Sequence, residues 1–110
     1  MTLPSPSPSP VDARLTQWGR TVEDIERGYP LTFDDYLNDL DLRRTLDEVE
    51  LTAEQVGRLS AFDDRFRQAS YPAGRCVWGD ENAQAEGWTA ESQWYYWRLP
   101  TTPGPAFLED

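Results

Sequence analysis

The feature that most constrains this fold is an apolar residue at every third or fourth position through three consecutive segments. In the first segment the apolar residues share one helix face, because they recur at alternating spacings of four and three. They are Val11, Leu15, Trp18, Val22 and Ile25. The sequence Gly-Tyr-Pro at 28–30 would end such a helix, so we predict a helix over 11–27.

Two further helices are predicted from the same periodicity and from residues that cap helix ends. Thr32 precedes two aspartates, a pattern typical of a helix N-terminus, and predicts a helix over 33–49. Thr52 and Gln55 have the spacing of a capping box and predict a helix over 53–69. Three amphipathic helices joined by short links favour an antiparallel bundle.

The C-terminal third changes from helical periodicity to aromatic and β-branched residues. Residues 75–78 (RCVW) and 93–99 (QWYYWRL) have the composition of strands, and the residues between them favour turns. We therefore predict two short strands in a β-hairpin, with neighbouring aromatic side chains on opposite faces. A short helix at 80–86 or 89–93 is the competing interpretation.

The predicted fold class is therefore mainly α (α+β), a three-helix antiparallel bundle with a small C-terminal β-hairpin. Residues 1–10, which alternate proline and serine, are predicted to be a disordered tail. Residues 100–110 contain three prolines and are predicted to be an irregular tail, with Phe107 and Leu108 as a candidate apolar plug. The single globular domain would span 11–99.

Composition removes several classes of site. There is no histidine and one cysteine, Cys76, which excludes an internal disulfide, the usual zinc sites and histidine-dependent catalysis. Cys76 is expected to be a small buried hydrophobe, since no lysine or histidine is present to lower its pKa. No cofactor or metal is predicted. The chain has no long apolar run and no secretory signal at its start, so no membrane association and a cytoplasmic location are expected.

An acidic run between residues 34 and 54 is the first candidate site. It holds eight acids against two arginines, in a chain whose net charge is -10. The run is either a solvated helix face or a negative surface that steers a basic partner. Six acids are candidate partner-binding residues: Asp34, Asp35, Asp39, Asp41, Glu48 and Glu50. A calcium loop is not predicted, because an arginine stands where its glycine is required.

Tryptophan supplies the second candidate site, since four of the five tryptophans lie between residues 78 and 97. Trp88, Trp94 and Trp97 are candidate anchors, because a tryptophan buries a large area at small entropic cost. The alternative is that loops and the C-terminal tail cover them. Direct nucleic-acid binding is not predicted, since stacking platforms of this kind accompany a basic groove and this chain is acidic.

Residues 34–44 (DDYLNDLDLRR), followed by 62–67 (FDDRFR), resemble small uncharacterised bacterial proteins of GC-rich species. That group has no assigned activity, so the resemblance implies a bacterial, cytoplasmic origin and no function. Arginine as the sole basic residue type is also typical of GC-rich genomes.

We predict a small, non-enzymatic protein-binding domain that docks a basic partner, such as a toxin or nuclease. An inhibitor of the immunity-protein or antitoxin kind is the setting in which such surfaces are common. The alternatives are a DNA-mimic inhibitor of a nucleic-acid-binding protein and a small enzyme that uses carboxylates alone. The sequence leaves the oligomeric state open.

Overall fold

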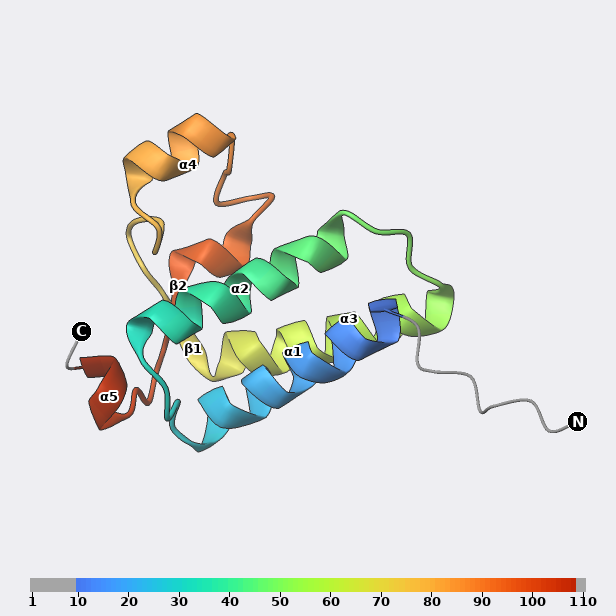
Figure 1. The fold of residues 1–110 in the computed structure, drawn as a ribbon, viewed down its shortest axis with the longest axis horizontal. Helices are drawn as coiled ribbons and strands as arrows, with labels where there is room; N and C mark the ends of the chain where they lie inside the picture. The colour runs from blue at the N-terminus through green and yellow to red at the C-terminus, as the bar shows by residue number, and fades with distance from the viewer. Residues whose placement is uncertain (1–9, 109–110) are drawn as a thin grey trace, which may run out of the picture.

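A computed structural model describes residues 10–108 and confirms the mainly α class with a small antiparallel sheet (Figure 1). The elements, in chain order, are α1 (Pro10–Arg27), α2 (Phe33–Asp47), α3 (Ala53–Gln68), β1 (Ser70–Pro72), α4 (Asp80–Glu86), the 3-10 helix η1 (Trp94–Trp97), β2 (Arg98–Pro100) and α5 (Pro105–Leu108). The predicted N-terminal tail lies outside the described residues except for Pro10. Pro10 begins α1, a position that suits proline because the first helical N–H needs no intrahelical acceptor.

α1, α2 and α3 begin and end close to the predicted positions because their end signals are local. The hydroxyls of Thr32 and Thr52 accept hydrogen bonds from the backbone N–H groups of Asp35 and Gln55, both at 3.2 Å. The Asp35 and Gln55 side chains accept in return from the Thr32 and Thr52 backbones, at 3.3 and 2.9 Å. Each reciprocal pair stabilises its helix by about 1 kcal/mol. α2 ends two residues before the prediction, where Glu48 is its C-cap.

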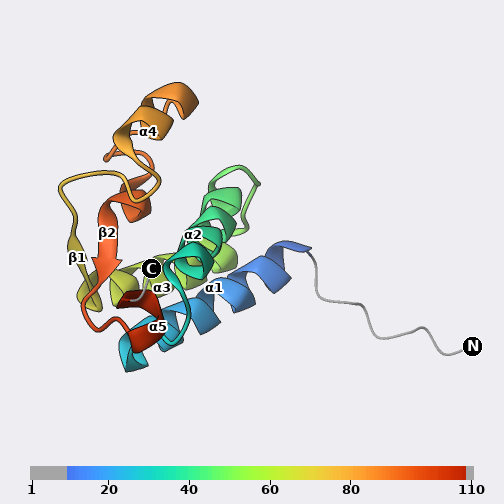
Figure 2. The same ribbon diagram turned by 60° about the vertical axis from the view of Figure 1, so that its left-hand side comes forward.

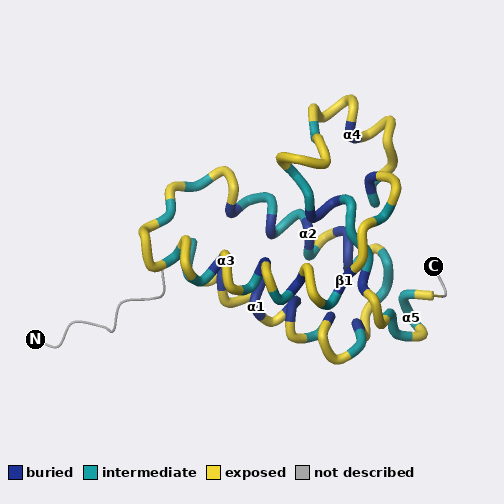
Figure 3. Tube along the Cα trace, turned by 180° about the vertical axis from the view of Figure 1, so that it is seen from behind, coloured by how far each residue is buried: buried dark blue, intermediate teal, exposed yellow. Residues whose placement is uncertain are grey.

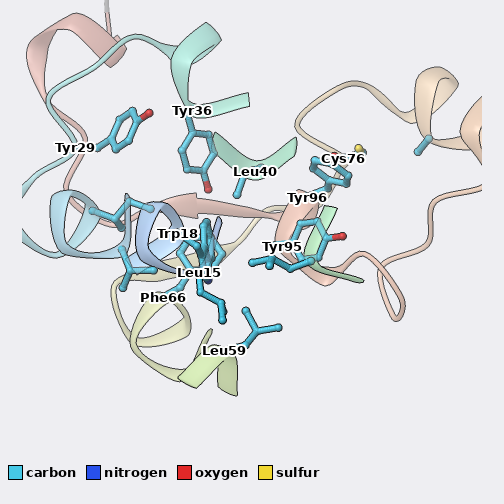
Figure 4. Packing of buried hydrophobic residues seen from close by; sticks show 14 residues of the cluster. Leu15, Trp18, Tyr29, Tyr36, Leu40, Leu59, Phe66, Cys76, Tyr95 and Tyr96 are labelled. Atoms are coloured by element: carbon cyan, nitrogen blue, oxygen red, sulfur yellow. The ribbon is translucent and has the colours of Figure 1, made fainter. Parts of the chain in front are cut away.

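The core is centred on α1, which packs on both α2 and α3 while consecutive helices run antiparallel (Figure 1). Four of the five residues of the predicted apolar stripe of α1 are buried, Val11 is partly buried, and Leu15 and Trp18 are fully inaccessible to solvent. Figure 4 shows both beside Phe66 of α3, whose ring meets the Trp18 indole edge-on, with 5.3 Å between centroids. Tyr95 and Tyr96 extend this core from the C-terminal third.

The two predicted strands are wrong in position. Residues 75–78 form a loop and a turn, α4 occupies 80–86 as in the competing interpretation, and η1 replaces most of the second strand. The physical reason lies in Tyr95 and Tyr96, which are adjacent in sequence and both fully buried. A strand would turn consecutive side chains to opposite faces, whereas a helical turn can direct two neighbours inward.

The antiparallel sheet joins β1 to β2, with Ser70 opposite Pro100 and Pro72 opposite Arg98. The segment 73–97 therefore begins and ends at this sheet. The backbone N–H of Ala73 donates a hydrogen bond to the Trp97 carbonyl at 2.7 Å. α4 lies in this segment and stands off the three-helix bundle in two views (Figures 1 and 2). Its surface is largely exposed apart from Ala83, as Figure 3 shows.

The predicted irregular C-terminal tail includes the end of β2 and the short helix α5. Phe107 packs edge-on against three aromatic rings, so the predicted apolar plug is present at this residue. The rings belong to Tyr29, Phe33 and Tyr36, with centroids 6.0, 5.5 and 5.5 Å away. Leu108 does not take part, since it is 70% exposed.

Candidate functional site

Part of the acidic run is bound by tyrosine side chains within the protein. Three tyrosine hydroxyls, one from before α2 and two from η1, each donate a hydrogen bond to an aspartate of α2. The bonds join Tyr29 to Asp39 at 2.6 Å, Tyr96 to Asp41 at 2.5 Å and Tyr95 to Asp47 at 2.8 Å. Asp41 and Asp47 hold the aromatic C-terminal segment against the bundle, and Asp39 holds the residues that precede α2, so the run is not simply a solvated face.

The environment of Asp39 changes the pKa of its carboxyl group. Burial raises the pKa of Asp39, the hydrogen bond from Tyr29 opposes that rise, and the neighbouring carboxylates of Asp35 and Asp24 add to it. The net direction is upward, so the ionised form of Asp39 is disfavoured relative to an exposed aspartate.

Asp41 is the point at which the acidic run and the tryptophans meet. One oxygen of Asp41 accepts from the Tyr96 hydroxyl and from the indole N–H of Trp78, the latter at 3.1 Å. Arg44, one turn along α2, donates to the same Tyr96 hydroxyl at 3.0 Å and places its guanidinium 5.6 Å from the Trp88 ring centroid. Trp88 in turn stacks on Tyr96, with 4.5 Å between centroids.

Two adjoining hollows lie around these residues, one between α2 and α4 and the other at the start of α4. One, of about 230 Å³, is lined by Asp41, Arg44, Trp78, Asn82, Glu86 and Trp88. The other, of about 550 Å³, is lined by Trp78, Gly79, Asp80, Glu81 and Asn82. Because Trp78 and Asn82 line both, the hollows form one surface, which we call the acidic groove.

The acidic groove has a strong charge imbalance, with four carboxylates against the single guanidinium of Arg44. Two of the carboxylates have structural partners, since Asp41 accepts from Trp78 and Asp80 accepts from the Cys76 backbone N–H at 3.1 Å. Glu81 and Glu86 are exposed side chains of α4 with no ion pair among the described residues. Their charge is therefore available to a ligand.

A second charged cluster belongs to the core and not to this surface. The Arg43 guanidinium donates two hydrogen bonds to Asp63, at 2.9 and 2.8 Å, and a third to Asp47 at 2.8 Å. Asp63 also accepts from the indole N–H of Trp18 at 3.1 Å. Burial lowers the pKa of Arg43, but Asp63 and Asp47 outweigh it and leave the pKa raised. This network joins α1, α2 and α3.

The structure disperses the residues predicted to bind a partner. Of the nine, Asp41 and Trp88 lie in the acidic groove. Trp94 and Trp97 line a different hollow of about 390 Å³, whose charged residues are Arg67, Arg98 and Glu91. The others lie along α2 and just after it: Asp35 in the cap, Asp39 bonded to Tyr29, Glu48 paired with Arg44 at 2.9 Å, and Asp34 and Glu50 exposed.

Three acidic residues of the acidic groove were not predicted as site residues: Asp80, Glu81 and Glu86. The signal was present in part, because Asp80 and Glu81 begin the competing helix at 80–86 and acids favour a first helical turn. Trp78 belongs to the tryptophan-rich segment of the second candidate site, but its bond to Asp41 could not be predicted, since it joins residues 37 positions apart.

Comparisons with known proteins do not extend these observations: no family model, curated protein or solved structure matches the chain. Within residues 10–108, no three side chains of the metal-binding types come together at a distance suited to an ion. In the same part of the chain, none of the helices combines the length and the apolar character needed to cross a bilayer.

Proposed function

We propose that this chain is a small, non-enzymatic protein-binding domain that docks a basic partner in the acidic groove. The observation that supports it best is the meeting of unpaired α4 carboxylates with two tryptophans whose positions are fixed by α2. An inhibitor of the immunity-protein or antitoxin kind, acting on a toxin or nuclease in the cytoplasm, is the setting that we favour.

Charge gives the first argument. Glu81 and Glu86 lie on a helix that stands off the bundle, so a cationic side chain can approach them without displacing other elements. The net charge of -10 adds a long-range attraction for a basic partner, which raises the association rate at low salt.

Aromatic geometry gives the second argument. The Arg44 guanidinium over the Trp88 ring and the Tyr96 ring stacked on it hold this indole in place. Trp78 and Trp88 are half-buried, and both are held by hydrogen bonds or stacking to residues of the core. Rigid tryptophans of this kind lose little entropy on binding and serve well as anchors.

A titration with an arginine-rich peptide tests the proposal. In the variant Glu81→Gln/Glu86→Gln, affinity is expected to fall by about tenfold at low salt, since each rim charge contributes up to about 1 kcal/mol. The salt dependence of the association rate should weaken in parallel. Calorimetry and stopped-flow tryptophan fluorescence measure the two quantities.

The matched control is Glu23→Gln/Glu54→Gln, which removes the same charge from exposed positions on α1 and α3. Equal losses in the two double variants would show a general attraction of the acidic chain and no groove. Unchanged affinity in the groove variant would refute the proposal.

The geometry gives less support to a DNA mimic. Such a protein needs a row of free carboxylates spaced like phosphates, and the carboxylates of Asp35, Asp39 and Asp41 in the acidic run accept hydrogen bonds within the protein. Competition between duplex DNA and this chain for one captured partner distinguishes the two functions.

A further inference from the structure

A fourth hollow lies beside the acidic groove and has a different chemistry. Its volume is about 350 Å³, within the roughly 300–1,000 Å³ range of small-molecule sites. It opens among the start of α2, the loop after β1 and strand β2, and it shares the Trp78 indole with the acidic groove. The lining residues are Phe33, Ala73, Arg75, Cys76, Val77, Trp78, Gly79 and Leu99.

The walls of this hollow combine four apolar side chains with polar atoms, and they carry one charged group. Phe33, Val77, Trp78 and Leu99 contribute apolar surface, and each of them is only partly buried, so the surface faces the hollow or solvent. The one ionisable side chain on the wall that is charged at neutral pH is Arg75.

Arg75 has no ion pair among the described residues, unlike five of the other arginines. The nearest carboxylate along the chain, Asp80, is not on the wall and already accepts a hydrogen bond from the Cys76 backbone. A guanidinium beside four apolar side chains matches a ligand with an apolar body and one carboxylate, because the guanidinium fork can donate two hydrogen bonds to that carboxylate.

We infer that this hollow binds a small apolar monocarboxylate, whose hydrocarbon part contacts Phe33 and Leu99 while its carboxylate meets Arg75. This site is additional to the proposed docking of a basic partner in the acidic groove, with which it shares Trp78 and Gly79. The two chemistries are opposite in charge, so they can be tested separately.

Cys76 provides a direct readout of occupancy. It lines the hollow, it is 1% exposed, and it is the one cysteine in the sequence. A ligand in the hollow is therefore expected to slow alkylation of Cys76 by iodoacetamide, measured by intact mass. The probes are octanoate, octanol and octylamine, which share an alkyl body and differ in charge.

Octanoate is expected to slow the alkylation most, octanol less and octylamine least. Arg75→Gln should weaken octanoate binding by about tenfold, the value of one charge-assisted interaction, and leave octanol unchanged. The matched control Arg20→Gln removes an exposed arginine of α1 and should change neither. Ala73→Phe, which fills the hollow without removing a hydrogen bond made by a side chain, should abolish protection by both.

Three results would overturn the inference: no protection by octanoate at millimolar concentration, equal protection by octylamine, or unchanged octanoate binding in Arg75→Gln. If Ala73→Phe lowers the helical circular dichroism, Arg75→Gln decides alone, because Arg75 is exposed and its loss removes no described ion pair. Binding of the arginine-rich peptide should be unaffected by Arg75→Gln, so failure here leaves the acidic groove untouched.

Discussion

Two adjacent aspartates of α3, Asp63 and Asp64, are expected to differ greatly in their effect on stability. Asp63 pairs with Arg43, and the two side chains are 9% and 5% exposed. Asp64 pairs with Arg67, and these side chains are 65% and 47% exposed. Replacing either aspartate by alanine removes one carboxylate from the same helix, so the comparison isolates burial.

The magnitude follows from what each change leaves behind. Asp63→Ala leaves the buried Arg43 guanidinium with Asp47 alone and leaves the Trp18 indole N–H without its acceptor. Breaking a buried pair from one side destabilises by about 3–5 kcal/mol, against a total stability of about 5–15 kcal/mol for a domain. Asp64→Ala breaks an exposed pair, for which about 0–1 kcal/mol is expected.

Urea unfolding followed by circular dichroism measures both values. With a slope of about 2 kcal/mol per molar urea, Asp63→Ala should lower the midpoint by about 2 M and Asp64→Ala by less than about 0.5 M. The double change Arg43→Met/Asp63→Leu should recover much of the loss, because no buried charge remains without a partner. Equal midpoints for Asp63→Ala and Asp64→Ala would refute the assignment of Asp63 to the core.

Three further outcomes are expected. A Cβ at Gly104 would lie 2.4 Å from the Tyr29 carbonyl oxygen, so Gly104→Ala should destabilise the fold by about 1–3 kcal/mol. Gly57 faces open space within α3, so Gly57→Ala should stabilise the fold by about 0.5–1 kcal/mol. Thermal unfolding of both variants checks the opposite signs. Phe107→Ala removes a half-buried ring from its contact with Tyr29 and should cost about 2 kcal/mol in the same assay. Burial raises the pKa of Asp39 in the folded state, so the stabilisation by Asp39 is present below its unfolded pKa of about 3.9 and is lost as the pH rises through its folded pKa. The free energy of unfolding of the unsubstituted chain, relative to that of Asp39→Asn, should therefore fall with rising pH across that window. Urea titrations at several pH values measure it.

The three long helices could be predicted because their determinants are local. The apolar stripe of α1 and the caps at Thr32 and Thr52 need no knowledge of distant residues, and all are present in the structure. The inward position of Arg43 could not be predicted in this way. Arg43 occupies a position on the inner face of α2 where an apolar residue is expected, and its partner Asp63 lies on another helix, 20 residues away.

The errors in the C-terminal third come from composition that fits two structures. Consecutive tyrosines and tryptophans are typical of strands, but the burial of both Tyr95 and Tyr96 requires a helical turn. That burial depends on hydrogen bonds to Asp47 and Asp41, 48 and 55 residues away. The same long-range bonds remove part of the acidic run from the surface, which is why the predicted site residues are dispersed.

The pairing of β1 with β2 has a consequence for how this chain can diversify. The pairing holds together the two ends of the segment 73–97. Backbone hydrogen bonds from Ala73 to Trp97 and from Val77 to Tyr96 also join the two arms of this segment. The stretch between Gly79 and Gln93 can thus accept insertions or substitutions, since doubling the length of a closed loop adds only about 0.6 kcal/mol to its loop-closure free energy. Because that stretch carries Glu81, Glu86 and Trp88, the charge and shape of this surface can change while the three-helix frame stays unaltered.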